Sequence, residues 1–180
     1  SYHDESIYIG YRYFDKIGCR VRFPFGHGLS YTTFEYSNLQ VDAEGVSVTV
    51  TNTGTRPGTE VDQVYVGPPE TTDFVAPQQL AGFARVTLEA GESTSVRIDF
   101  SEHAFSVFDV AAGKWRQRKG LYAALVGASS RDIRLEGTVE VDGEEFDLNY
   151  DRDLLPHYFS GEVKGIGASE FAQLLGRTPP

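Results

Sequence analysis

The clearest structural signal in the chain is the stretch VSVTVT at residues 46–51, in which valines alternate strictly with hydroxyl-bearing side chains. A period of two residues places alternate side chains on opposite faces of a β-strand, so one face is apolar and the other is polar. The stretch SVRIDF at 95–100 repeats the alternation, as does IRLE at 133–136 followed by VEV at 139–141. We expect further strands at 34–41, 60–66, 83–88, 107–110, 114–118 and 120–127.

Turn-forming residues separate these expected strands. NTGTRPG at 52–58 combines Asn and Gly, which tolerate positive φ, with Pro, which has a restricted φ. EAGE at 89–92 and AAG at 111–113 are shorter turns. Seven or more short strands joined by turns indicate an all-β sandwich or barrel. We predict a two-layer antiparallel β-sandwich whose core contains Val46, Val48, Val50, Val96, Ile98, Phe100, Leu121 and Leu125.

Composition argues against several functional classes. The 180 residues suit one domain with ordered flanks. A net charge of −10 makes nucleic acid and acidic membrane surfaces poor partners. Cys19 is the single cysteine, so neither an intrachain disulfide nor a thiolate metal cluster is possible. The single cysteine and the absence of a visible signal peptide favour a cytoplasmic location.

Few residues form a recognisable catalytic or metal-binding pattern. Asp4, Glu5 and Asp15 lie near aromatic residues, as carboxylates of sugar sites do, but their positions fit solvated or capping roles better. The four histidines do not cluster in sequence, and no nucleotide-binding loop is present, so we expect neither a metal nor a cofactor. Three acidic residues follow a turn and are interpreted as a charged strand edge: Glu144, Glu145 and Asp147.

The N-terminal segment is dense in aromatic residues. Tyr11, Arg12 and Tyr13 could stack on sugar rings, because aromatic faces and planar cations suit such contacts. We favour the alternative that this segment anchors one part of the protein to another. Near the C-terminus, Phe171, Leu174 and Leu175 lie at helical spacing, which predicts a short helix over 169–175 that Ser169 caps and Gly176 ends.

Several longer motifs resemble one enzyme family. IYIGYRYFD at 7–15 and FPFGHGLSYTTF at 23–34 are similar to the junction between the second catalytic domain of family 3 glycoside hydrolases and their fibronectin type III-like domain. The resemblance continues in order through VTVTNTGTRPGTEVDQVYV at 48–66, QQLAGFARVTLEAGES at 78–93 and GLYAALVGASSRDIRL at 120–135. EFAQLLGRTPP at 170–180 resembles an extension found after the module in some members.

The resemblance implies an immunoglobulin or fibronectin type III-like antiparallel β-sandwich with irregular N- and C-terminal extensions. Residues 1–33 would then be the linker and end of a preceding α/β domain, 34–148 the sandwich and 149–180 a C-terminal extension. The implied role is a non-catalytic scaffold within a retaining β-glucosidase that hydrolyses terminal non-reducing β-D-glucosyl residues. Its partners would be the catalytic domains of the same enzyme, and oligosaccharide substrate as well. The catalytic Asp and Glu of that family match no residue here.

Two expectations concern the junction. The motif residues Phe23, Pro24, Phe25, Gly26, Gly28, Leu29 and Tyr31 are predicted to form a structural hinge that docks the N-terminal segment on the sandwich. Residues 1–15 would be exposed, folded back on the sandwich, or paired with another copy, and we expect mobility or a homodimer contact there. The competing hypothesis is a free-standing carbohydrate- or protein-binding module that uses the aromatic N-terminal segment.

Overall fold

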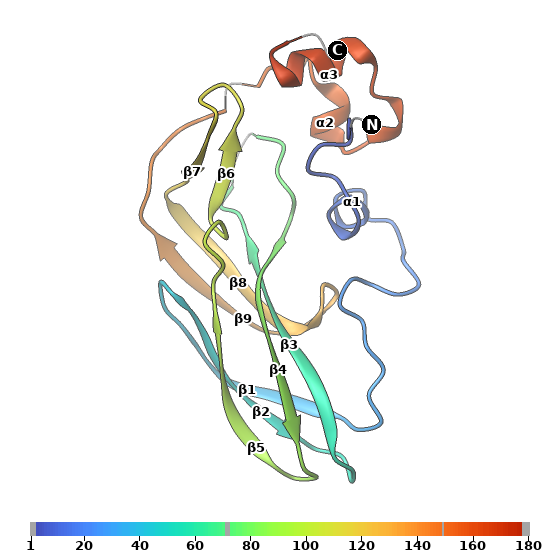
Figure 1. Cartoon of the computed structure of the whole chain (residues 1–180), viewed down its shortest axis with the longest axis vertical. Helices are drawn as coiled ribbons and strands as arrows, with labels where there is room; N and C mark the ends of the chain where they lie inside the picture. The colour runs from blue at the N-terminus through green and yellow to red at the C-terminus, as the bar shows by residue number, and fades with distance from the viewer. Residues whose placement is uncertain (1–2, 71–72, 149, 178–180) are drawn as a thin grey trace.

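The computed structural model describes residues 3–70, 73–148 and 150–177, and it consists mainly of two facing antiparallel sheets (Figure 1). One sheet has the strand order β1-β2-β5, and the other has the order β4-β3-β8-β9. The strands β6 and β7 form a separate hairpin. The bounds are β1 Phe34–Val41, β2 Gly45–Asn52, β3 Gly58–Gly67, β4 Gln79–Leu88, β5 Ser93–Asp99, β6 Ser106–Asp109, β7 Lys114–Gln117, β8 Gly120–Ser129 and β9 Asp132–Val141. The predicted all-β antiparallel fold is therefore confirmed.

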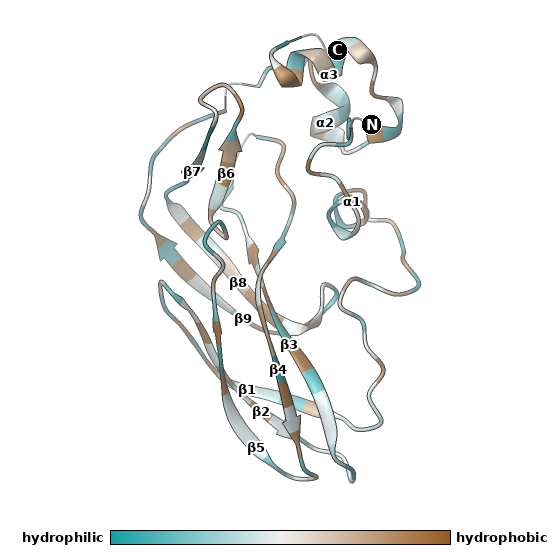
Figure 2. Cartoon of the chain, in the orientation of Figure 1, coloured by the Kyte–Doolittle hydropathy of each residue, from teal (hydrophilic) through white to brown (hydrophobic). Residues whose placement is uncertain are grey.

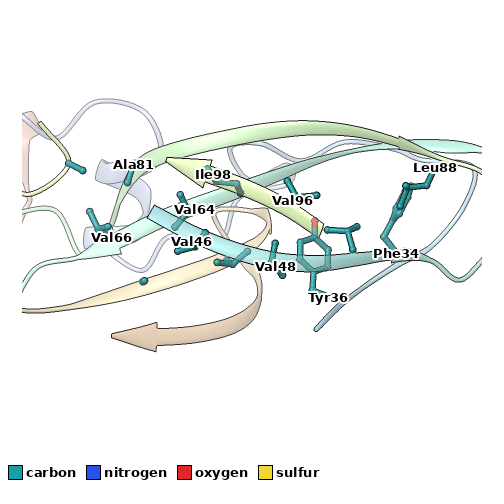
Figure 3. Packing of buried hydrophobic residues seen from close by; sticks show 14 residues of the cluster. Phe34, Tyr36, Val46, Val48, Val64, Val66, Ala81, Leu88, Val96 and Ile98 are labelled. Atoms are coloured by element: carbon teal, nitrogen blue, oxygen red, sulfur yellow. The ribbon is translucent and has the colours of Figure 1, made fainter. Parts of the chain in front are cut away.

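The main core lies between the two sheets, and Figure 3 shows its side chains meeting there. Val46, Val48 and Val50 of β2 are at most 1% exposed. In the register of β2 with β5, Val46 pairs with Ile98 and Val48 with Val96, both of which are buried. The opposite sheet contributes Val64, Val66, Ala124 and Val126. Figure 2 shows the alternation of apolar and polar bands along the strands that produces this arrangement.

The core prediction was wrong for β8. Leu121 is 60% exposed, and Leu125 is only partly buried. The residues that point inward are instead Tyr122, Ala124 and Val126. Both faces of this strand carry apolar side chains, so alternation alone cannot specify which face is buried. Phe100, by contrast, packs against the core as predicted, although it is only partly buried.

Short helices flank the sandwich and form a second core. They are α1 (Tyr11–Lys16), α2 (Pro156–Ser160), the 3₁₀ helix η1 (Val163–Gly165) and α3 (Ala168–Leu175). None of the helices in the described residues is long and apolar enough to cross a membrane. The second core, here called the terminal cluster, contains Tyr8, Phe74, Leu155, Tyr158, Val163 and Leu174. Figure 1 shows α2 and α3 at the end of the molecule where the N-terminal segment also lies.

The terminal cluster shows how the two extensions are packed. The helix predicted at 169–175 is present and ends at Gly176 in a left-handed conformation, but Gly167 takes the cap position predicted for Ser169. The N-terminal segment folds back onto the tail: Tyr8 is 1% exposed, and the Tyr158 hydroxyl donates to the Asp4 carbonyl at 2.6 Å. The expected extensions also include residues 1–2, 149 and 178–180, which lie outside the described residues.

Candidate functional site

The candidate site is the junction where helix α1 and the following arm, residues 17–33, contact the outer face of the β4-β3-β8-β9 sheet. Tyr11 carries much of this contact. Its hydroxyl accepts the Leu80 backbone N–H at 2.8 Å, and its ring stacks on Phe25 with centroids 4.7 Å apart. Tyr65 meets the same ring edge-on at 6.0 Å. These contacts hold Tyr11 within the protein and give its ring an anchoring role.

Asp15 is the ionic anchor of helix α1. Its carboxylate accepts from Gln78 Nε2 at 3.2 Å and from Arg131 Nε at 3.0 Å. Arg131 also donates to the Phe14 carbonyl at 3.2 Å, so it binds the helix at two points. Asp15, considered in the sequence as a sugar-site carboxylate, is thus placed as the partner of a cation. A side chain held in this way positions the helix against the turn between β8 and β9.

Tyr13 makes different contacts from Tyr11, whereas the Arg12 guanidinium carbon lies over the Tyr11 ring at 6.0 Å from its centroid. Tyr13 packs against the terminal cluster and tilts toward Phe14 with centroids 5.4 Å apart. Arg12 lines a cavity, and its Nε is buried without a hydrogen-bond partner among the described residues. Tyr11 and Arg12 are thus neighbours, whereas Tyr13 packs against a different part of the protein.

The motif at 23–31 makes backbone hydrogen bonds with the sandwich at Phe25 and Gly26. The Phe25 carbonyl accepts the Ser130 N–H at 2.9 Å, and the Gly26 carbonyl accepts from Gln63 Nε2 at 3.3 Å. Gly26 has φ of 80°, a conformation that glycine adopts readily. The expectation that Phe23, Leu29 and Tyr31 also dock was wrong, because they are 65%, 88% and 93% exposed.

Gln63 organises the sheet beneath this motif, and the sequence reading did not identify it as an anchor. Its amide nitrogen donates to the Ala128 carbonyl at 2.8 Å, and its amide oxygen accepts the Tyr65 hydroxyl at 2.6 Å. Gln63 is only 4% exposed although it is on the outer face of β3. A polar side chain within an apolar strand was the available signal, because buried polar groups are usually hydrogen-bonded.

The remaining candidate residues take structural positions. The Glu144 carboxylate accepts a hydrogen bond from Arg116 at 2.7 Å, and the Glu144 backbone forms an isolated β-bridge with Arg118. Glu144 therefore lies beside the β6–β7 hairpin instead of on the expected charged strand edge. The ion pair lowers the pKa of Glu144. His157 Nδ1 lies 2.7 Å from Glu170 Oε2, which links α2 to α3. The described residues contain no group of three potential metal ligands.

Comparison with known proteins identifies the relatives of this fold. Residues 60–130 match the family model of the fibronectin type III-like domain. The chain is 44% identical over 141 residues to "Probable beta-glucosidase K" of Emericella nidulans, covering 77% of this chain and 17% of the relative. It is 42% identical over 148 residues to "Exo-alpha-(1->6)-L-arabinopyranosidase" of Bifidobacterium breve, covering 79% and 19%. The crystal structure of the family 3 β-glucosidase of Bifidobacterium adolescentis matches with a TM-score of 0.74 and 34% identity, covering 89% and 25%.

The two-sheet fold and the matching family model show that the sandwich is a fibronectin type III-like domain. More particularly, this fibronectin type III-like domain matches the C-terminal portion of glycoside hydrolase family 3 β-glucosidases. The chain spans about a fifth of the length of the curated relatives named above.

Proposed function

We propose that this chain is the non-catalytic scaffold module of a family 3 glycoside hydrolase that removes terminal non-reducing β-D-glucosyl residues. Residues 34–148 are the module, 1–33 are the connection to the catalytic domains, and 149–180 are an extension that holds this connection. The relatives named above include a β-glucosidase and an arabinopyranosidase, and the proposed glucoside preference follows the β-glucosidases among them.

The observation that carries the proposal is the exposed apolar surface of the arm. Phe23, Leu29 and Tyr31 are 65% to 93% exposed, and Phe83 on the outward side of β4 is 68% exposed. Exposed apolar groups of this kind mark interaction surfaces. The matched relatives are several times longer than this chain, so they contain additional domains that would cover such a surface.

The test compares the same substitutions in two settings. Leu29→Asp and Tyr31→Asp are introduced into the chain alone and into a polypeptide that joins the chain to family 3 catalytic domains. In the chain alone both side chains already face water, so we expect the unfolding midpoint to change little. In the joined polypeptide a charge enters a buried interface, and we expect a clear loss of thermal stability and of glucosidase activity.

Ser30→Asp is the matched control in the same arm, because Ser30 is exposed and carries no apolar side chain to be covered. Equal tolerance of all three substitutions in the joined polypeptide would contradict the scaffold role.

The competing carbohydrate-platform hypothesis predicts saturable binding of cello-oligosaccharides to the chain alone. It is less well supported, because Tyr11 is held between Phe25 and Tyr65 and its hydroxyl is used by Leu80.

A further inference from the structure

A cavity of about 560 Å³ lies beside the terminal cluster. Its walls come from the N-terminal segment, the loop at 74–76, the β6–β7 hairpin and helix α3. Aromatic rings of Phe74, Phe108, Trp115 and Tyr122 line it, together with aliphatic side chains. This volume lies within the roughly 300–1,000 Å³ that is usual for small-molecule pockets, whose walls are also mostly apolar.

The charge of the cavity wall differs from that of the whole protein. The chain has 26 acidic and 16 basic residues, yet no Asp or Glu is among the described residues that line the cavity. The lining does include two arginines, Arg12 and Arg118, and two histidines, His3 and His103. A region without carboxylates in an acidic protein favours an anionic ligand over a cationic one.

Arg12 is the cation best placed to hold such an anion. Arg118 is already paired with Asp73, whereas no ion pair joins Arg12 to any of the described residues. The buried Nε of Arg12 also has no hydrogen-bond partner there. Burying a polar or charged group without a partner costs free energy, and a carboxylate would supply both a charge and hydrogen-bond acceptors.

We propose that this cavity binds an aromatic carboxylic acid, with the ring against the aromatic wall and the carboxylate at Arg12. The mostly apolar wall offers few partners for the many hydroxyl groups of a sugar, so it disfavours an oligosaccharide. An apolar ligand without charge would fill the space but leave Arg12 unsatisfied. The proposal does not depend on the scaffold function, because it concerns contacts within this chain alone.

Trp115 provides the measurement, because it is the single tryptophan of the chain and lines the cavity. The chain is titrated with 3-phenylpropionate and with its uncharged counterpart 3-phenylpropanol, following tryptophan emission and heat of binding. We expect saturable binding of the acid and at least tenfold weaker binding of the alcohol. Arg12→Met should weaken binding of the acid at least tenfold and bring it close to that of the alcohol.

Arg20→Met is the matched control, because Arg20 is exposed and does not line the cavity. It should leave binding unchanged. Ala76→Phe places a ring in the cavity wall while keeping Arg12, and it should abolish binding of both compounds. Circular dichroism of each variant confirms that the sandwich is retained, and Ala76→Phe still tests the site if Arg12→Met does not fold. Absence of saturable binding, or equal binding of the acid by wild type, Arg12→Met and Ala76→Phe, would overturn the proposal.

Discussion

Asp62 is a buried carboxyl group on the core side of β3. It is fully buried, and neither carboxylate oxygen has a hydrogen bond of ordinary geometry among the described residues. Burial raises the pKa of Asp62, and the nearby Tyr36 hydroxyl and Arg134 guanidinium offset only part of that rise. A carboxyl group with a raised pKa holds its proton more tightly in the folded state than in the unfolded state. Its contribution to stability is therefore full below the unfolded pKa and is lost as the pH rises through the folded pKa.

Asp62→Asn should stabilise the protein at neutral pH, because the amide needs no proton to remain uncharged. We expect a gain of about 1–3 kcal/mol in the free energy of unfolding at neutral pH, shrinking towards the unfolded pKa of about 3.9. Urea unfolding of both proteins across this pH range measures the difference. The exposed Asp147→Asn is the control and should show little effect at any pH. A destabilised Asp62→Asn protein at pH 7 would show that the ionised carboxylate is compensated.

Gly26 and Gly28 are two residues apart in the motif at 23–31, and they differ in how much space and which backbone conformation each position has. A Cβ on Gly26 would lie 2.1 Å from Oε1 of Gln63, and its φ of 80° is unfavourable for alanine. Gly28 has open space around the same position. Gly26→Ala should therefore cost about 1–3 kcal/mol of stability through backbone strain and displacement of Gln63, whereas Gly28→Ala should cost much less. Thermal unfolding of the two variants gives the comparison, and equal losses would contradict this account.

The short helices depend on contacts with distant elements. Helix α2 has five residues and α3 has eight, lengths at which isolated helices are unstable. Glu170 of α3 accepts the His157 backbone N–H at 3.0 Å and also contacts the His157 ring, so it satisfies a free donor in the first turn of α2. The apolar side of both helices is buried in the terminal cluster. Tertiary packing therefore stabilises helices that propensity alone would leave unformed.

Two adjacent leucines test this dependence. Leu155 is 2% exposed within the terminal cluster, whereas Leu154 is 52% exposed. Leu155→Ala should reduce the stability of the cluster by about 2–5 kcal/mol, because it leaves a cavity among aromatic rings. Leu154→Ala should change it by no more than about 0.5 kcal/mol. Hydrogen exchange of amides in α2 and α3 reports the local effect, and similar exchange in both variants would argue against a cooperative cluster.

At the level of the whole molecule, two cores share one polypeptide. The sandwich core lies between the sheets, and the terminal cluster joins residues from both chain extensions and the loop at Phe74. Helix α1 connects them, since Tyr11 and Asp15 contact the sandwich while Tyr13 packs against the cluster. A segment that is fixed at several points keeps a defined orientation relative to the sandwich, as the proposed connecting role of residues 1–33 requires.

We predict that the chain alone does not hydrolyse 4-nitrophenyl β-D-glucopyranoside, because glycosidic cleavage requires two carboxyl groups positioned across the bond. Joining the chain to family 3 catalytic domains should give turnover. Release of 4-nitrophenol measures both proteins under the same conditions. Asp15→Asn in the chain alone serves as a control for an unrecognised site. Turnover by the wild-type chain that disappears in Asp15→Asn would contradict the non-catalytic role.

The strands and their antiparallel sandwich could be predicted from the sequence, because the alternation at 46–51 and 95–100 and the intervening turns are local features. Local spacing also predicted α3 and its end at Gly176. The tertiary structure decided which face of β8 is buried, since Leu121 and Tyr122 are both apolar enough to occupy a core. The tertiary structure also makes Tyr11, Asp15 and Gln63 anchors of the N-terminal segment, and it packs that segment against the terminal helices. The bond from Tyr158 to Asp4 spans 154 residues. Contacts over such separations leave no periodic pattern in a single sequence, because they depend on how completed elements pack against one another.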